Sequence, residues 1–171
     1  MKLDYCKVRD VKSPNRGTKD SAGLDFFVPE YSETLKKDII NKKSYITIDE
    51  DGNITIPKHR SVLIPSGIKT DILQSCGEML IGEINNVALI AFNKSGITSK
   101  KQLIMGACVV DSDYEGEIWV NLINTSDEDV IISCGDKITQ FVAIPLVILT
   151  PNELTHQMKM LLFRVVIKLH N

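Results

Sequence analysis

The sequence predicts an all-β fold, built as a β-sandwich or a jelly-roll-like β-barrel. Short runs rich in Val, Ile and aromatic residues recur along the chain, as strands require. Turn-forming segments such as SPNRG, IPSG and NKSG separate these runs. The long amphipathic helices that a parallel α/β sheet would need are missing from the pattern. Many short strands divided by turns are typical of sandwiches and barrels.

The strands are expected where apolar or alternating runs lie between turn signals. In chain order they are Leu3–Val8, Leu24–Val28, Tyr45–Ile48, Ile54–Ile56, Ser61–Ile64, Gly67–Thr70, Val87–Phe92, Ala107–Val110, Ile118–Ile123, Val130–Ile132 and Ile138–Pro145.

A surface elaboration is predicted at residues 31–56, made of a short helix and a hairpin. Glu33–Lys42 carries an i, i+4 apolar pair, Leu35 and Ile39, which favours a helix. The dipeptide Asp51-Gly52 within TIDEDGNITI is a preferred hairpin turn. The charged residues of this segment are most simply explained as a solvent-exposed face. Elsewhere, Lys100–Met105 is expected to form a single helical turn at most.

Two regions follow from this division: a β domain over residues 1–150 and an atypical C-terminal tail over residues 151–171. After Pro151 the chain is apolar and basic and contains no glycine, and its pattern fits a helix and a strand equally well.

Composition excludes several classes of function. The 171 residues carry a net charge of −2, so no global basic field exists to hold nucleic acid. The four cysteines lack CxxC spacing and the three histidines are scattered, which predicts reduced thiols of a cytoplasmic protein and no zinc site. The N-terminus alternates like a strand and unlike a signal peptide. No run of about 18 apolar residues exists to span a membrane.

Acidic residues interrupt an apolar run in GACVVDSDYEGEIWVNLIN, Gly106–Asn124. The Val- and Ile-rich flanks suit strands, and acids beside Gly116 suit a turn. The segment therefore predicts a β-hairpin with carboxylates and one tyrosine at its bend. A plain turn and a functional site explain it about equally well.

Three further segments place polar groups beside apolar strands. DSAGLDFF brings Asp25 to the start of a strand, FNKSGITSKKQL contains Lys94, Ser95 and Gly96, and GDKITQFVAIPL holds Gln140 within a strand. A cation, a hydroxyl and an exposed backbone N–H are what a phosphate chain requires. Taken singly, each segment fits a turn or a satisfied core group better than a site.

Together and in this order, the four segments resemble motifs one to four of the homotrimeric dUTPase family. The matching stretches are SAGLDFF, NKSG, VVDSDYEGEI and GDKITQFV, and the resemblance covers about residues 3–150. It implies a jelly-roll-like β-barrel that assembles as a homotrimer with active sites at the subunit interfaces. The implied activity is Mg²⁺-assisted hydrolysis of dUTP to dUMP and pyrophosphate, which limits uracil incorporation into DNA and supplies dUMP.

The resemblance also implies roles for residues of the third motif. Asp111 matches the catalytic carboxylate that activates the attacking water and bonds the sugar 3′-OH. Tyr114 matches the ring that packs on the deoxyribose and leaves no room for a 2′-OH. The main chain at Val109 and Val110 matches the wall that pairs with uracil and rejects thymine and cytosine.

The other three motifs imply a phosphate and metal site. Lys94, Ser95 and Gly96 match the phosphate-binding motif, and Gln140 matches a polar phosphate contact. Asp25 matches the acid that holds waters of Mg²⁺, a metal bound chiefly by the three phosphates. The implied partners are dUTP, dUMP and two further copies of the chain, with neither nucleic acid nor membrane. The implied location is the cytoplasm, or that of a host cell if the chain is viral.

The sequence departs from the family pattern in its tail and at one cation. Lys94 stands where the family usually has arginine, so the charge is kept and the two-pronged grip on oxygens is lost. The glycine-rich fifth motif that closes over the nucleotide is absent, and Arg164 is the only arginine of the tail. Two alternatives therefore stay open: a non-catalytic or weakly active trimeric nucleotide-binding or regulatory protein that lacks the lid, and a dCTP deaminase relative on the same fold.

Overall fold

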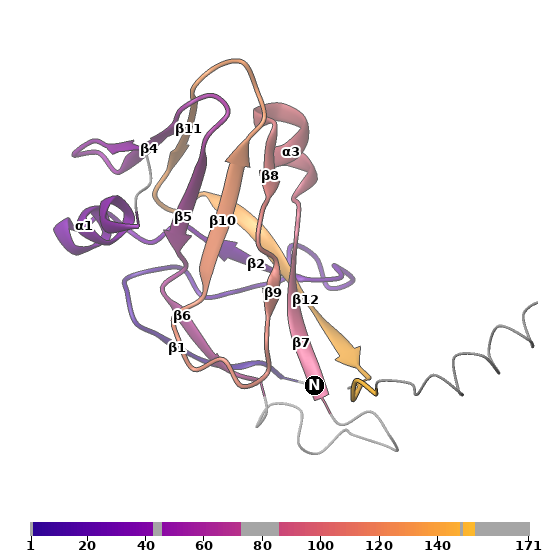
Figure 1. The fold of residues 1–171 in the computed structure, drawn as a ribbon. Helices are drawn as coiled ribbons and strands as arrows, with labels where there is room; N and C mark the ends of the chain where they lie inside the picture. The colour runs from indigo at the N-terminus through magenta and orange to yellow at the C-terminus, as the bar shows by residue number, and fades with distance from the viewer. Residues whose placement is uncertain (1, 43–45, 73–85, 148, 153–171) are drawn as a thin grey trace, which may run out of the picture.

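The computed structural model describes residues 2–42, 46–72, 86–147 and 149–152 (Figure 1). These residues form short strands and two helices, whose bounds are β1 Asp4–Lys7, β2 Leu24–Phe27, α1 Glu33–Asn41, β3 Thr47–Ile48, β4 Asn53–Ile56, β5 Ser61–Pro65, β6 Ile68–Asp71, β7 Asn86–Phe92, α3 Ser95–Lys101, β8 Leu103–Met105, β9 Val109–Val110, β10 Trp119–Asn124, β11 Val130–Ser133 and β12 Lys137–Leu146. The predicted all-β class is confirmed.

The strands form small antiparallel sheets around one apolar core. The largest has the strand order β2-β12-β7-β9, and the others are β5-β10-β8, β11-β4-β3 and β1-β6. In Figure 1, the sheet of β5, β10 and β8 lies in front of β2 and β12. Alternation along β10 turns Val120 and Leu122 into the core, where the rings of Phe26 and Phe141 meet edge to face at 4.6 Å.

Helix α1 begins and packs as the sequence predicts. The side chain of Ser32 accepts a hydrogen bond from the N–H of Leu35 at 3.0 Å, which caps the first turn. Leu35 and Ile39 are both fully buried, so one stripe of the helix joins the core. The segment 31–56 thus contributes core side chains as well as surface charge.

The predicted hairpin at Asp51-Gly52 is confirmed, because β3 and β4 pair antiparallel around it. Gly52 adopts a φ of +78°, which is easy only for glycine. The carboxylate of Asp49 accepts hydrogen bonds from the N–H groups of Asp51 and Asn53, which closes the turn.

The hairpin predicted between Ala107–Val110 and Ile118–Ile123 is wrong. β9 pairs with β7, whereas β10 pairs with β5 and β8, so the two limbs belong to different sheets. Gly106 follows β8 beside β10, and an added Cβ there would lie 2.8 Å from the side chain of Asn121. The acidic loop therefore crosses between sheets rather than turning within one.

The single helical turn predicted at Lys100–Met105 is also wrong in its position. Helix α3 covers Ser95–Lys101, and Leu103–Met105 is strand β8, which the sequence analysis missed. Gln102 ends the helix in the left-handed region at a φ of +51°, and its N–H donates to the carbonyl of Thr98 at 3.1 Å.

Some predictions fall outside the described residues. These are the tail from residue 153 onward with Arg164, the position of Cys76, and Tyr45 at the start of a predicted strand. Within the described ranges no helix is long and apolar enough to cross a membrane. The division at residue 150 stays a prediction.

The close approach of β12 to Gly23 predicts a steric defect in Gly23→Ala. An added Cβ would lie 2.8 Å from the backbone carbonyl oxygen of Phe141, which moves only with the strand. We expect the free energy of unfolding to fall by about 1–3 kcal/mol, measured by urea denaturation. Gly96→Ala is the matched control, because no atom lies within 4 Å of its added Cβ and a helical alanine is favourable. Equal stability of the two variants would contradict this account.

Candidate active site

The phosphate motif lies where β7 passes into α3. Lys94 has extended backbone angles and immediately precedes the helix, so Ser95 and Gly96 are its first two residues. Both are exposed, and as the first residues of a helix their N–H groups have no helical acceptor. Nothing lies within 4 Å of the position where a Gly96 Cβ would be, so a ligand can approach the backbone closely.

Asp25 is a buried carboxylate held by two lysines. Its side chain is 4% exposed, with Lys94 Nζ 2.5 Å from Oδ1 and Lys137 Nζ 2.9 Å from Oδ2. Burial alone would raise the pKa of Asp25, but the hydrogen bonds and charges of Lys94 and Lys137 outweigh it, and the net pKa is lowered. The sequence analysis missed Lys137, because nothing local in GDK shows that its side chain reaches β2.

The register of the largest sheet brings three of the motifs together. Gln140 on β12 lies opposite Asp25 on β2 and opposite Phe92 on β7, so all three share one face of the sheet. Lys94 follows Phe92 by two residues and reaches the same side, as its contact with Asp25 shows. Asp25, Gln140 and the residues 94–96 therefore form one end of the sheet, called here the phosphate end.

Asp111 and Tyr114 lie on the loop after β9, called here the acidic loop, residues 111–118. The N–H of Tyr114 donates to the carbonyl of Asp111 at 3.2 Å, which bends the loop at its start. Asp111 is exposed and Tyr114 is 43% exposed. The Tyr114 hydroxyl donates to the carbonyl of Glu117 at 2.9 Å, and its ring covers Gly116, where any Cβ would clash.

A partly buried ion pair anchors the end of the acidic loop. Arg9 binds both carboxylate oxygens of Glu117, with Nε–Oε1 at 2.7 Å and Nη2–Oε2 at 2.9 Å. The N–H of Gly67 donates to the same carboxylate at 2.8 Å. The hydrogen bonds to Glu117 raise the pKa of Arg9, burial opposes them, and Asp38 adds to the rise. Local sequence cannot reveal this pair, because its partners are 108 positions apart.

Val109 presents its backbone to an open edge. The N–H of Ala91 donates to the carbonyl of Cys108 at 2.7 Å, and Val110 lies opposite Leu89. Because ladder bonds alternate along an antiparallel pair, the N–H and C=O of Val109 point away from β7. β9 is the last strand of its sheet among the described residues.

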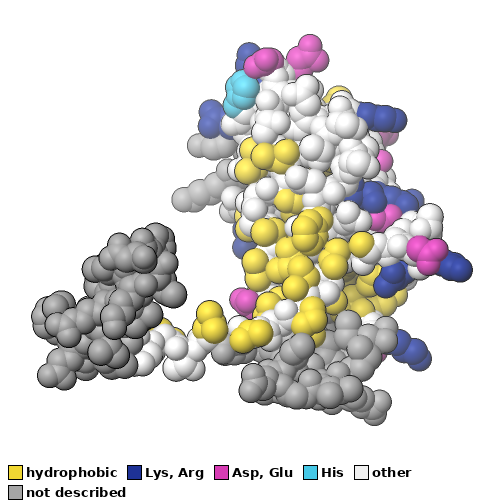
Figure 2. Space-filling model, turned by 90° about the vertical axis from the view of Figure 1, so that its right-hand side faces the viewer, with side chains coloured by type: hydrophobic (Ala, Val, Ile, Leu, Met, Phe, Trp, Pro, Cys, Tyr) yellow, Lys and Arg dark blue, Asp and Glu magenta, His cyan; other side chains and the backbone are white. Residues whose placement is uncertain are grey.

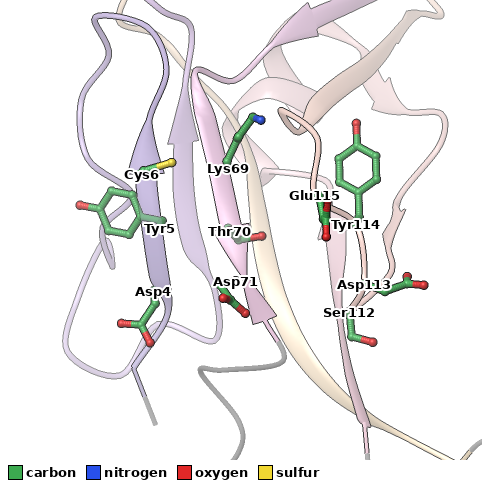
Figure 3. A pocket seen from close by; sticks show the side chains of 10 residues that line it. All are labelled: Asp4, Tyr5, Cys6, Lys69, Thr70, Asp71, Ser112, Asp113, Tyr114 and Glu115. Carbon is green, nitrogen blue, oxygen red and sulfur yellow. The ribbon is translucent and has the colours of Figure 1, made fainter.

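A pocket of about 790 Å³ separates the acidic loop from β1 and β6, within the size range of small-molecule sites, about 300–1,000 Å³. Figure 3 shows Ser112–Glu115 on one side of this pocket and Lys69–Asp71 on the other. Tyr114 lines the pocket, whereas Asp111, Val109 and Val110 do not.

The acidic loop and the phosphate end lie at different levels along β7. Val110 is opposite Leu89, so the chain leaves the sheet toward Asp111 near the middle of β7, whereas Lys94 lies two residues beyond the end of β7 at Phe92. Because β9 runs antiparallel to β7, the chain after Val110 continues away from Phe92 and Lys94. The strand pairing therefore directs the acidic loop away from the phosphate end.

The described residues offer oxygen donors for Mg²⁺ without forming a metal cage. No three Asp, Glu, His or Cys side chains cluster within the described ranges, and both oxygens of Asp25 contact lysines. This donor set fits a magnesium ion carried by the triphosphate itself, with the protein contacting its waters.

Comparisons with known proteins identify the family of this chain. The model of the dUTPase family matches residues 52–161. The deoxyuridine 5'-triphosphate nucleotidohydrolase of Haemophilus ducreyi is 31% identical over 147 residues, which cover 85% of this chain and 77% of that protein. The protein of the same name from Buchnera aphidicola is 26% identical over 125 residues, covering 72% and 71%.

Solved structures share the fold. The dUTPase of Streptococcus mutans superposes with a TM-score of 0.58 at 23% identity, covering 86% of this chain and 98% of that one. The dUTPase from phage phi11 of S. aureus gives a TM-score of 0.63 at 17% identity, covering 91% and 96%. With four motifs in order, this fold and a family model that matches most of its length, the chain belongs to the dUTPase family.

Proposed function

We propose that this chain hydrolyses dUTP to dUMP and pyrophosphate in a site that a second copy of the chain completes. The observation that carries the proposal is that the pairing of β9 with β7 directs the acidic loop away from the phosphate end of the same chain. Both ends carry groups suited to one triphosphate, and only a neighbouring copy brings them together. A closed homotrimer repeats this contact three times, because a head-to-tail interface can close into a ring.

The outer face of the largest sheet supports assembly. By alternation, Ile90 and Phe92 on β7, Val142 and Ile144 on β12, and Val109 on β9 point to this face. Phe92 is 43% exposed and Val109 is 59% exposed, while the others are partly buried. Figure 2 shows hydrophobic side chains gathered on the side of the molecule that carries β7 and β12. An apolar patch joined to a site is typical of an interface.

Asp111 acts as the general base. An exposed carboxylate on a bent loop can reach a phosphate chain bound by a neighbour, accept a proton from the attacking water and bond the 3′-OH. Positioning of that water relative to the phosphorus supplies much of the rate enhancement, since phosphoryl transfer needs little covalent help from the protein.

Tyr114 and Val109 select the nucleoside. The ring of Tyr114 is held over Gly116 by its bond to Glu117, so it forms a fixed wall for a deoxyribose. The open backbone edge of Val109 offers one donor and one acceptor, the complement of a uracil edge. Cytosine presents the opposite pattern and would leave these groups unpaired.

The phosphate end neutralises the triphosphate. The exposed N–H groups at Ser95 and Gly96, the Lys94 ammonium and the Gln140 amide converge on one end of the sheet. When bound with the phosphates, Mg²⁺ would offset charge on the leaving group, and Asp25 would contact its waters. Asp25 also orients Lys94, which partly replaces the rigidity of an arginine.

The cellular role proposed is control of the dUTP pool, which limits uracil in DNA and supplies dUMP. The described cysteines, Cys6, Cys108 and Cys134, are free thiols, which fits the cytoplasm.

Subunit mixing tests both the base and the shared site. Asp111→Asn removes the base and is expected to lower kcat about 100-fold or more. Lys94→Gln removes the phosphate cation from the other end and is also expected to lower the rate. Because each site takes one end from each of two copies, refolding an equal mixture should restore about a quarter of wild-type activity. Each variant refolded alone is the control, and no gain on mixing would place the site within one chain.

The sugar wall predicts a change of specificity in Tyr114→Ala. We expect the ratio of kcat/KM for dUTP to that for UTP to fall at least about tenfold, because space for a 2′-OH opens. Tyr114→Phe keeps the ring and should retain most of the discrimination. An unchanged ratio in Tyr114→Ala would refute the role of the ring.

The ion pairs at Asp25 predict an acid-sensitive contribution to stability. A lowered folded-state pKa stabilises above the unfolded pKa of about 3.9, and this contribution is lost as the pH falls through the folded value. Asp25→Asn should therefore be less stable than wild type at pH 7, with the difference shrinking toward pH 3 in urea denaturation. Asp127→Asn, which removes a carboxylate 98% exposed beside His59, should differ little throughout. A constant difference for Asp25→Asn would contradict the ion-pair account.

A further inference from the structure

Arg9 lies at the centre of a chain of contacts that leads from helix α1 to Tyr114. Its side chain is 14% exposed and that of Glu117 is 13% exposed, so the two-pronged pair between them is shielded from water. A planar guanidinium that grips both oxygens fixes the orientation of a carboxylate as well as its position. Glu117 is therefore held at one place and one angle at the end of the acidic loop.

Glu117 passes this restraint to Tyr114 through its backbone. Its carbonyl accepts the hydrogen bond from the Tyr114 hydroxyl at 2.9 Å. The next residue, Ile118, is tied on both sides, because its N–H donates to Ile68 and its carbonyl accepts from Ser66, each at 2.9 Å. A shift of Glu117 would carry the tyrosine hydroxyl with it.

Helix α1 holds the guanidinium of Arg9 through a second carboxylate. Asp38 on the helix accepts a hydrogen bond from Arg9 Nη2 at 2.7 Å, so one guanidinium joins two carboxylates. Lys42, just after the helix, places its ammonium 4.9 Å from the centre of the Trp119 ring. Glu117 and Trp119 lie two residues apart, so both contacts hold the segment that leaves the acidic loop.

The helix is a rigid base for these contacts. Leu35 and Ile39 are fully buried, and Ser32 caps the first turn. Movement of α1 would disturb the core, so the position of Asp38 is set by packing and not by solvent-exposed charge alone.

We propose that Arg9 is a positioning residue for the nucleotide site, and that α1 acts through it to fix the ring of Tyr114 and so contributes to the choice of sugar. This inference rests on the proposed function, in which Tyr114 excludes the 2′-OH. It assigns the segment 31–56, through Asp38, a task in substrate selection. Without the contacts of Arg9 the Tyr114 ring can tilt and leave space for a 2′-OH. The kcat/KM for UTP then rises relative to that for dUTP.

The experiment compares sugar discrimination in graded variants of Arg9 and Asp38. The readout is the ratio of kcat/KM for dUTP to that for UTP, because loss of folded enzyme lowers both rates equally and leaves the ratio unchanged. We expect Arg9→Met to lower the ratio about tenfold and Arg9→Lys to lower it less, since lysine keeps the charge without the fork. Asp38→Asn should lower it severalfold with Glu117 still bound to Arg9. If Arg9→Met fails to fold, the Arg9→Lys and Asp38→Asn variants decide the question.

Glu33→Gln is the matched control on the same helix. Its carboxylate accepts from the exposed hydroxyl of Tyr31 and lies outside the contacts with Arg9, so the ratio should not change. Hydrogen exchange supplies a second readout: amides of residues 111–118 should exchange faster in Arg9→Met and Asp38→Asn than in Glu33→Gln.

The outcomes separate this inference from the proposed function. If Tyr114→Ala lowers the ratio while the Arg9 and Asp38 variants leave it unchanged, Arg9 is a structural brace only and the inference is overturned, even if exchange rises. If wild type fails to hydrolyse dUTP, the proposed function fails first. A lowered ratio with faster exchange in the acidic loop supports the inference.

Discussion

The antiparallel pairing of β7 with β12 on one side and β9 on the other is the constraint on which the site depends. It aligns Gln140 and Asp25 with the end of β7 and carries the chain after Val110 toward its start. The phosphate-binding groups and the acidic loop are thereby separated along a single strand. In the proposed function a second copy brings the two ends together, and the apolar outer face of the same sheet lies between them.

Charge in this protein is organised as paired clusters that hold loops in place. Asp25 joins Lys94 and Lys137 at the phosphate end, and Arg9 joins Glu117 and Asp38 at the other. In each cluster one buried or partly buried group of one sign is shared by two groups of the other, so its charge is compensated on two sides. Lys94 belongs to the first cluster, and the second holds Glu117, whose carbonyl accepts the hydrogen bond of the Tyr114 hydroxyl.

The family's usual arginine at position 94 would supply two parallel donors from one side chain. Here a lysine supplies a single point charge, and the neighbouring Asp25 restricts where that charge can lie. The Lys94 side chain is 24% exposed, so it is shielded from water only in part. Because Asp25 restricts the position of Lys94, it favours phosphate binding. The replacement of arginine by lysine removes a second donor and disfavours it.

The sequence by itself determined the all-β class, most strands, helix α1 and the Asp51-Gly52 turn, because each depends on side-chain periodicity or on local turn chemistry. Only the tertiary structure decided the partners of each strand. The acidic segment looked like a hairpin because its flanks are strands, yet Ile118 bonds to Ile68 and Ser66 while Val110 pairs with Leu89. The same holds for Arg9 with Glu117 and for Lys137 with Asp25. These pairings join residues far apart in the chain, and which of many similar strands lie side by side depends on packing of the whole core rather than on any local pattern.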